Sequence, residues 1–138
     1  MTGSLHIITL NIPYPPDYGG MIDSYYRIRS LHEAGIGIHL HCFEYGRNHS
    51  EELEKFCKTV NYYPRDTSFS RHLSLMPYIV ISRNSEKLLE NLSRDDNPIL
   101  FDGLHATYWL DHPSLSGRQK YVRAHNIEHF YYKTLARF

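Results

Sequence analysis

The sequence predicts an α/β domain built on a Rossmann-like, mainly parallel sheet with helices on both faces. Short runs rich in β-branched and aromatic residues alternate with segments whose apolar residues recur every three or four positions. The intervening segments are long enough for a helix to cross from one strand to a parallel neighbour. With 138 residues, 41% of them apolar and 22% charged, residues 1–138 have the size and composition of one globular domain.

The first part of the chain is expected to form a complete strand–helix–strand unit. Its elements are a strand over 5–10, a loop over 11–20, a helix over 21–34 and a strand over 36–43. The loop contains three prolines and two glycines, which exclude a helix or a central strand there. Between Met21 and Leu31, apolar residues recur at helical steps and form one stripe. Gly35 follows, where a left-handed residue ends the helix.

The remainder of the chain repeats the alternation of helices and strands. It is expected to hold a helix over 50–57, a strand over 60–63, a helix over 84–94, a strand over 99–101, a helical turn over 107–110, a strand over 120–123 and a helix over 127–138. Ser50 is the expected N-cap of the first of these helices. Residues 65–82, interrupted by Pro77, are assigned no element. The final helix either closes the domain or lies where a longer protein continues.

Charge and targeting signals exclude several classes of protein. Lys and Arg together number 15, as do Asp and Glu, so the formal net charge is zero and no partner nucleic acid is expected. No apolar run approaches the roughly 20 residues of a membrane span, and the N-terminus carries no secretory signal. Cys42 and Cys57 are interpreted as the reduced thiols of a cytoplasmic protein.

The loop over 11–20 is a candidate ligand site because it follows a strand and precedes a helix. Ligands of open parallel sheets bind beyond the carboxyl ends of the strands. Gly19 and Gly20 let the backbone approach a ligand closely, and the amides and dipole of the following helix favour an anion such as phosphate. The segment matches neither the Walker pattern nor G-x-G-x-x-G, and a plain structural turn is the alternative.

Two segments carry a resemblance to a known family. Residues 13–20 read PYPPDYGG and lead into the helix that ends at Gly35, and residues 123–129 read RAHNIEH. Together they resemble the N-terminal domain of the family 4 glycosyltransferases, which are retaining, nucleotide-sugar-dependent enzymes of the GT-B architecture. The resemblance covers nearly the whole chain but is sharp only in these two segments.

The resemblance implies a donor side for the site. Gly19 and Gly20 match the family's glycine-rich loop, which lies against the donor diphosphate, so their amides would donate to the leaving phosphate. His125 matches a histidine beside the donor sugar and is the candidate catalytic residue. The alternative for His125 is a histidine whose hydrogen bonds are satisfied at a strand end.

The resemblance also implies an acceptor side. Asp102 and His105 follow a strand and would face the interdomain cleft, where they are candidates for contacting the acceptor. For Asp102 the alternative is an Asp-Gly pair that stabilises a turn. Arg123 is either a third residue of this cleft or a salt-bridge partner.

The chain departs from the family because the second domain of a GT-B enzyme does not fit after His125. That C-terminal domain supplies most contacts to the donor nucleotide, so the chain is expected to be inactive alone. The whole enzyme would move a sugar from a nucleotide diphosphate to a glycan or lipid-linked acceptor in polysaccharide biosynthesis. The resemblance implies no metal and no cofactor other than the nucleotide-sugar substrate. It leaves open contact of the full-length enzyme with the inner face of a membrane.

Three other interpretations compete with this one. Residues 125–129 match the inverted zinc-protease pattern H-x-x-E-H, but His125 is expected at a strand-to-helix junction rather than on the helix face of His129. His39 and His41 share one face of a strand that could hold a metal, but two ligands make a weak site, so we interpret them as exposed residues of an edge strand. The third alternative is a non-enzymatic α/β nucleotide-binding or regulatory module.

Overall fold

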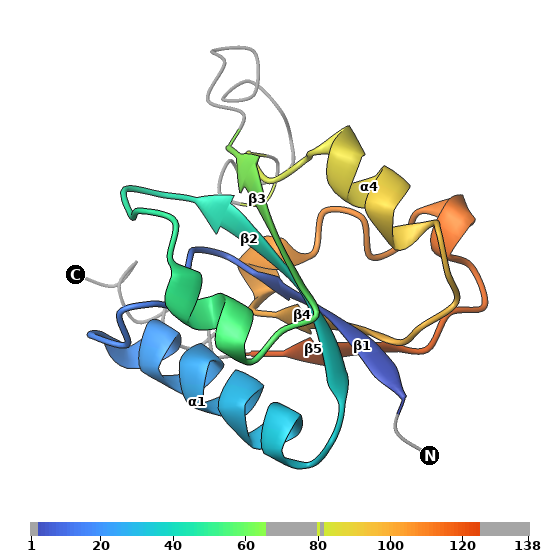
Figure 1. Ribbon diagram of the computed structural model, residues 1–138. Coiled ribbons are helices and arrows are strands. Elements are labelled where there is room, and N and C mark those ends of the chain that lie inside the picture. Colours follow the sequence, from blue (N-terminus) through green and yellow to red (C-terminus); the bar gives the residue numbers. More distant parts are fainter. Residues whose placement is uncertain (1–2, 66–79, 81, 125–138) are drawn as a thin grey trace.

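Five parallel strands form one sheet in the computed structural model, which describes residues 3–65, 80 and 82–124. The strands are β1 (Ser4–Thr9), β2 (Gly37–Glu44), β3 (Thr59–Pro64), β4 (Ile99–Asp102) and β5 (Lys120–Arg123). Their order across the sheet is β3-β2-β1-β4-β5, and every neighbouring pair is parallel (Figure 1). This is the strand order of a doubly wound, Rossmann-like sheet, so the predicted fold class is confirmed.

Helices cover both faces of the sheet, as expected. The helix α1 (Gly19–Glu33) and the 3-10 helix η1 (Glu51–Lys55) lie on one face, and α4 (Glu86–Leu92) lies on the other (Figure 1). The 3-10 helices η2 (Leu104–Ala106) and η3 (Pro113–Leu115) contribute to the core under α4. Across the described residues, no helix has the length and apolarity that a membrane crossing requires.

The helix α1 has the expected apolar stripe and the expected end, but it starts earlier than expected. It begins at Gly19 rather than Met21. The prediction starts later because glycine has a low helix propensity, so the two glycines are assigned to the loop. At the other end, Gly35 has φ of 86° and donates its amide to the His32 carbonyl at 2.9 Å. The Ile36 amide reaches the Leu31 carbonyl at 3.1 Å, which completes a Schellman motif.

The other helices are shorter than their sequence signals suggested. The expected helix over 50–57 is the 3-10 helix η1, although Ser50 is its N-cap, as predicted, and accepts a hydrogen bond from the Glu52 amide at 3.2 Å. The helix expected over 84–94 is α4, where the Ser85 hydroxyl accepts from the Leu88 amide. The turn expected over 107–110 is present as a bond from the Leu110 amide to the Thr107 carbonyl. The expected helix over 127–138 lies outside the described residues.

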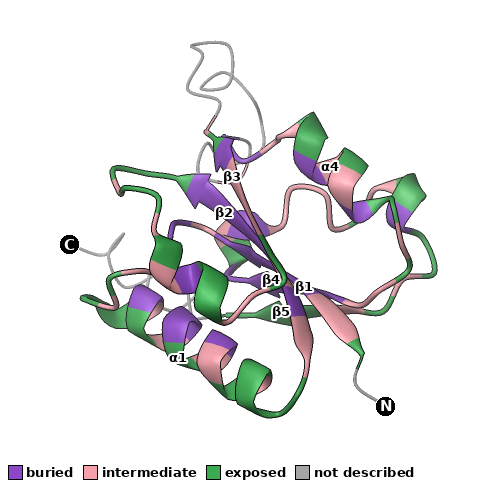
Figure 2. Cartoon of the chain, viewed as in Figure 1, coloured by how far each residue is buried: buried purple, intermediate pink, exposed green. Residues whose placement is uncertain are grey.

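Two separate cores stabilise the two faces of the sheet (Figure 2). The core under α1 consists of Ile7, Ile12, Tyr25, Ile28, Ile38, Leu40, Cys42 and Leu53. The core under α4 consists of Ile8, Phe43, Tyr63, Leu88, Leu92, Ile99, Phe101, Ala106 and Leu115. Adjacent residues such as Ile7 and Ile8 belong to opposite cores because side chains alternate between the two faces of a strand. The central strand β1 is therefore apolar on both faces at this point.

Candidate functional site

The carboxyl ends of β1 and β4 meet at the switch point of the sheet. The chain builds β2 and β3 on one side of β1, and then places β4 and β5 on the other side. Thr9, at the end of β1, lies in register with Asp102, at the end of β4. Ligands of open α/β sheets bind in the crevice beyond such a switch point, so the residues around it are the candidates for a functional site.

The loop after β1 is held in place by short-range and long-range hydrogen bonds. The Thr9 hydroxyl donates to the Asn11 carbonyl at 2.7 Å. The Asn11 side chain accepts from the Ile12 amide at 2.8 Å and donates to the Tyr45 carbonyl at 3.1 Å. The peptide bond before Pro15 is cis. The hydrogen bonds of Thr9 and Asn11 fix the path by which the chain leaves β1 and enters α1.

The amino end of α1 directs backbone amides to this edge. Tyr18 is the N-cap and makes no side-chain hydrogen bond to the first turn. The first bond within the helix runs from the Ile22 amide to the Tyr18 carbonyl at 2.8 Å, so the amides of Gly19 and Gly20 have no carbonyl to bond inside the helix. The first turn holds no acidic residue. This arrangement has the polarity that favours a bound anion.

Asp102 is buried beneath α1, with 1% of its surface exposed. Its two carboxylate oxygens accept hydrogen bonds from the Ser24 hydroxyl and the Arg27 guanidinium, each at 2.7 Å. Removing a carboxylate from water is costly unless it is paired, and α1 supplies both of these partners. Asp102 therefore anchors α1 to the end of β4. Its contact with an acceptor stays a prediction.

Arg27 extends this network to the end of β5. Its guanidinium also donates to Asp23, one helical turn earlier, and the same carboxylate oxygen accepts from Arg123 Nε at 3.2 Å. Burial opposes ionisation of Asp23, but the hydrogen bonds and charges of Arg27 and Arg123 outweigh it and lower the pKa of Asp23. Arg123 is thus a salt-bridge partner, which is one of its two interpretations, and its acceptor role stays a prediction.

The contact between Asp23 and Arg123 brings together the two segments that carry the family resemblance. Asp23 lies one turn after Gly19 and Gly20, and Arg123 opens the segment over 123–129. Nearly the whole described chain separates these segments in sequence. Parallel pairing of β4 with β5 is what returns the second segment to the same edge as the first.

The turn after β4 places His105 at this edge as well. Gly103 has φ of 112°, a backbone conformation that favours glycine. Its amide donates a hydrogen bond to the Arg123 carbonyl at 2.8 Å. His105 lies on η2 and is partly exposed. His125, the predicted catalytic residue, lies outside the described residues, as does the zinc-protease pattern over 125–129.

A hollow of about 480 Å³ opens between the loops that follow β1 and β2. Arg47 lies in its wall and donates to Asp17 at 2.8 Å and to the Pro15 carbonyl. Its guanidinium carbon lies 5.4 Å from the centre of the Tyr18 ring, next to the start of α1. Sequence reasoning missed Arg47, although its position directly after the second strand places it at the edge where ligands bind.

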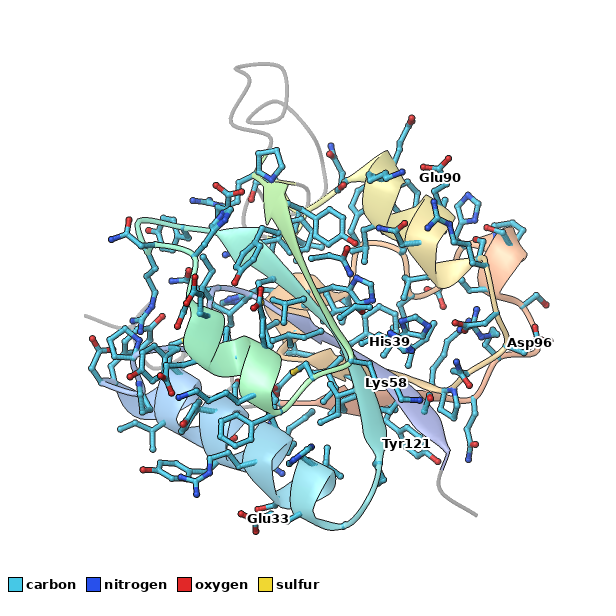
Figure 3. All side chains as sticks on the ribbon, viewed as in Figure 1. Glu33, His39, Lys58, Glu90, Asp96 and Tyr121 are labelled. Atoms are coloured by element: carbon cyan, nitrogen blue, oxygen red, sulfur yellow. The ribbon has the colours of Figure 1, made fainter. Side chains whose placement is uncertain are left out.

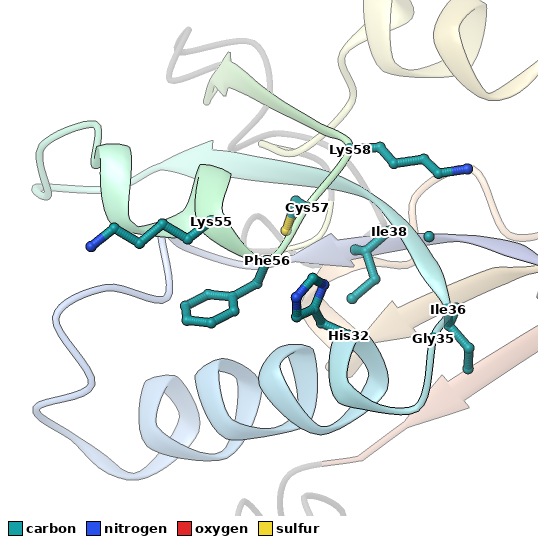
Figure 4. A pocket seen from close by; sticks show the side chains of 9 residues that line it. His32, Gly35, Ile36, Ile38, Lys55, Phe56, Cys57 and Lys58 are labelled. Carbon is teal, nitrogen blue, oxygen red and sulfur yellow. The ribbon is translucent and has the colours of Figure 1, made fainter.

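Another hollow, of about 290 Å³, lies at the opposite, amino edge of the sheet (Figure 4). Its walls come from the end of α1 and from the segments that lead into β2 and β3, and they include His32, Phe56 and Cys57. Burial raises the pKa of the Cys57 thiol to about 12, which makes it a poor nucleophile. This hollow contains none of the predicted site residues.

The interpretation of His39 and His41 as exposed residues of an edge strand is wrong. Their strand, β2, lies between β1 and β3, and His41 is only 1% exposed. The sequence shows a polar–apolar alternation, but it does not show which strand occupies an edge. Among the described residues, no group of three or more His, Cys, Asp or Glu side chains has an arrangement that could hold a metal ion.

Comparison with known proteins finds a distant relative of most of the chain. The chain is 27% identical over 136 residues to an uncharacterized 44.6 kDa protein in the cps region of Klebsiella pneumoniae. The match covers 94% of this chain but only 35% of the relative, so the chain spans about a third of the relative's length. No family model matches the sequence, and no solved structure matches it.

Proposed function

We propose that this chain is the acceptor-side domain of a retaining glycosyltransferase that acts in polysaccharide synthesis. The observation that carries the proposal is the meeting of the glycine-rich start of α1 with the end of β5 at the carboxyl edge of the sheet. The relative in a cps region, a region for capsular polysaccharide, supports a role connected with polysaccharides. Because the chain spans about a third of that relative, the proposal concerns the activity of a larger protein.

The start of α1 would act on the leaving group of the reaction. When the bond between the sugar and the donor phosphate breaks, the phosphate oxygen keeps the electron pair and gains negative charge. The amides of Gly19 and Gly20 point from the positive end of α1 and would stabilise this charge as it develops. The acceptor hydroxyl forms the new bond to the sugar carbon and passes its proton to the leaving phosphate oxygen, and His125 is the candidate residue beside that sugar.

The ionic network would act as a support for this site. Asp102 and Arg27 fix α1 against the end of β4, and Asp23 ties the same helix to Arg123. A donor phosphate at the start of α1 is then held at a set position relative to Arg123 at the end of β5. Such positioning is a large part of how enzymes lower a barrier.

The test measures donor turnover by the full-length protein with a panel of UDP-, GDP-, dTDP- and ADP-sugars. Gly19→Leu is the decisive variant, because a Cβ at Gly19 meets no heavy atom within 4 Å and the fold accepts a side chain there. Release of nucleoside diphosphate should fall by about 100-fold, the typical loss when donors to a developing charge are blocked. Gly3→Leu, equally open but at the opposite edge of the sheet, is the matched control and should keep full turnover.

Each outcome of this test has a definite meaning. Absence of turnover with every donor contradicts the proposed activity, and nucleotide binding without turnover favours the non-enzymatic nucleotide-binding module. Full turnover by Gly19→Leu keeps the transferase but removes the start of α1 from its mechanism.

A further inference from the structure

A chain of hydrogen bonds crosses the polar half of the face under α4. His6 on β1, His41 on β2 and Tyr63 on β3 share this face and are 3%, 1% and 3% exposed. His6 Nδ1 lies 2.9 Å from His41 Nε2, and His41 Nδ1 lies 2.8 Å from the Tyr63 oxygen. At the two ends, Asp95 lies 2.9 Å from His6 Nε2, and Asn91 donates to the Tyr63 oxygen at 2.8 Å. The chain therefore ties three strands to α4 and to the loop after it.

The chemistry of its members sets the direction of this chain. The Asp95 carboxylate only accepts, so His6 Nε2 carries a hydrogen and, in the neutral ring, His6 Nδ1 is an acceptor. His41 Nε2 must then be the donor to His6, which leaves His41 Nδ1 to accept from the Tyr63 hydroxyl. The Tyr63 oxygen in turn accepts from Asn91. Every donor points toward Asp95, and both imidazoles are neutral.

An added proton disrupts this arrangement wherever it binds. A proton on His6 Nδ1 places an N–H group against the N–H group of His41 at 2.9 Å. If the His41 ring shifts its own proton to Nδ1, it donates to Tyr63, which already accepts from Asn91, and the Tyr63 hydrogen loses its acceptor in the chain. A proton on His41 Nδ1 produces the same conflict at Tyr63. A buried polar group without a partner is costly, so the closed arrangement excludes the extra proton.

The surrounding charges mostly oppose protonation of the pair. Asp95 favours a charged His6, but it is shared with Arg118, which lies 3.4 Å from it. His39, labelled in Figure 3, has its ring centre 5.1 Å from that of His6, and Arg94 lines the same hollow of about 210 Å³ above the histidines. Burial outweighs Asp95 and lowers the pKa of His6.

We propose that this chain is a pH-sensitive latch, which holds α4 and the loop after it closed on the sheet while both imidazoles are neutral and releases them when the pair takes up a proton. Opening exposes His6 and His41 to water, where imidazoles have an ordinary pKa of about 6.5. Acid therefore favours the open form. The hollow that His6, His41 and Asp95 line gives water access to the latch from outside.

The test is hydrogen–deuterium exchange of the full-length protein at pH 7.5 and pH 5.5, corrected for the intrinsic effect of pH on exchange. Backbone amides over 86–97 should open between about 10-fold and about 100-fold more often at pH 5.5, the range for one or two imidazoles. Amides of α1 should keep their protection, because α1 packs on the opposite face of the sheet, away from the two histidines. Nitrogen NMR at pH 7.5 should find both His6 and His41 protonated at Nε2.

A matched control separates the latch from a general effect of acid. His39→Gln removes a neighbouring histidine that lies outside the chain, where its Nδ1 pairs with the Thr59 hydroxyl, and it should leave the pH effect intact. His41→Gln should reduce the effect by about tenfold. If His41→Gln fails to fold, the unaltered protein still decides the matter. Equal loss of protection in α1 and α4, no change with pH, an Nδ1-protonated ring, or loss of the effect in His39→Gln overturns the proposal.

Discussion

Both faces of the sheet bury polar side chains, but the two sets differ in how they are stabilised. Under α1, Asp102 at the end of β4 accepts hydrogen bonds from the Arg27 guanidinium and the Ser24 hydroxyl of the helix. Under α4, His6 and His41 form a neutral chain that requires one proton on each ring. An arginine keeps its proton at every pH that a protein meets, whereas an imidazole gains one near neutrality.

This difference teaches that one fold can combine a network that tolerates acid with one that does not. At Asp23, burial opposes ionisation, but Arg27 and Arg123 outweigh it and lower the pKa of the carboxyl below its ordinary value of 3.8, so this carboxylate stays charged in mild acid. The histidines under α4 lose their directed hydrogen bonds when either ring gains a proton. The ion pairs of Asp23, on the face that carries the proposed site, therefore resist mild acid.

Loss of the buried ion under α1 should have the largest effect. Asp102→Ala leaves Arg27 and Ser24 without their buried acceptor, and breaking such a pair costs about 3 kcal/mol or more. Urea denaturation at pH 7.5 measures the change. Arg123→Ala is the matched control, since its pair with Asp23 is exposed and should change stability by less than about 0.5 kcal/mol. Similar losses in the two variants would contradict a central role for Asp102.

Mild acid should have the next largest effect, through the face under α4. Burial lowers the pKa of His41 from 6.5 to about 3, so the unfolded chain binds a proton that the folded one does not. Stability is thus fully present above pH 6.5 and declines as the pH falls, by about 2 kcal/mol at pH 5 for this residue alone. Urea denaturation between pH 8 and pH 5 checks the slope. A flat profile over this range contradicts the neutral, buried state of His41.

The two helices end differently, and the smallest predicted effect sharpens that contrast. The helix α1 ends at Gly35, whose φ of 86° is strained for any residue with a side chain. Gly35→Ala should therefore lower the free energy of unfolding by about 1 kcal/mol. The C-cap of α4, Ser93, has φ of −77°, so Ser93→Ala should lose only its hydroxyl bond to the Leu89 carbonyl on the surface. Thermal unfolding of both variants tests the contrast, and a larger loss in Ser93→Ala would reverse it.

Local signals predicted the elements, and they did so because each depends on neighbours in sequence. The helical stripe from Met21, the glycine stop at Gly35 and the cap at Ser50 act over a few residues, and the structure has all three. The candidate site was predicted as residues at strand ends and at the glycine-rich start of one helix. That Arg123 reaches Asp23 at the start of α1 follows from the pairing of β5 with β4.

By itself, the sequence determined the α/β class, the alternation of strands and helices, and the charges available at the carboxyl edge, because these depend on residue type and periodicity. Only the tertiary structure decided the strand order, which moved His41 from an expected edge into the interior. It also decided the partners of buried polar groups, such as His6 with His41 and Asp102 with Arg27, since desolvation acts on groups that folding brings together from distant parts of the chain.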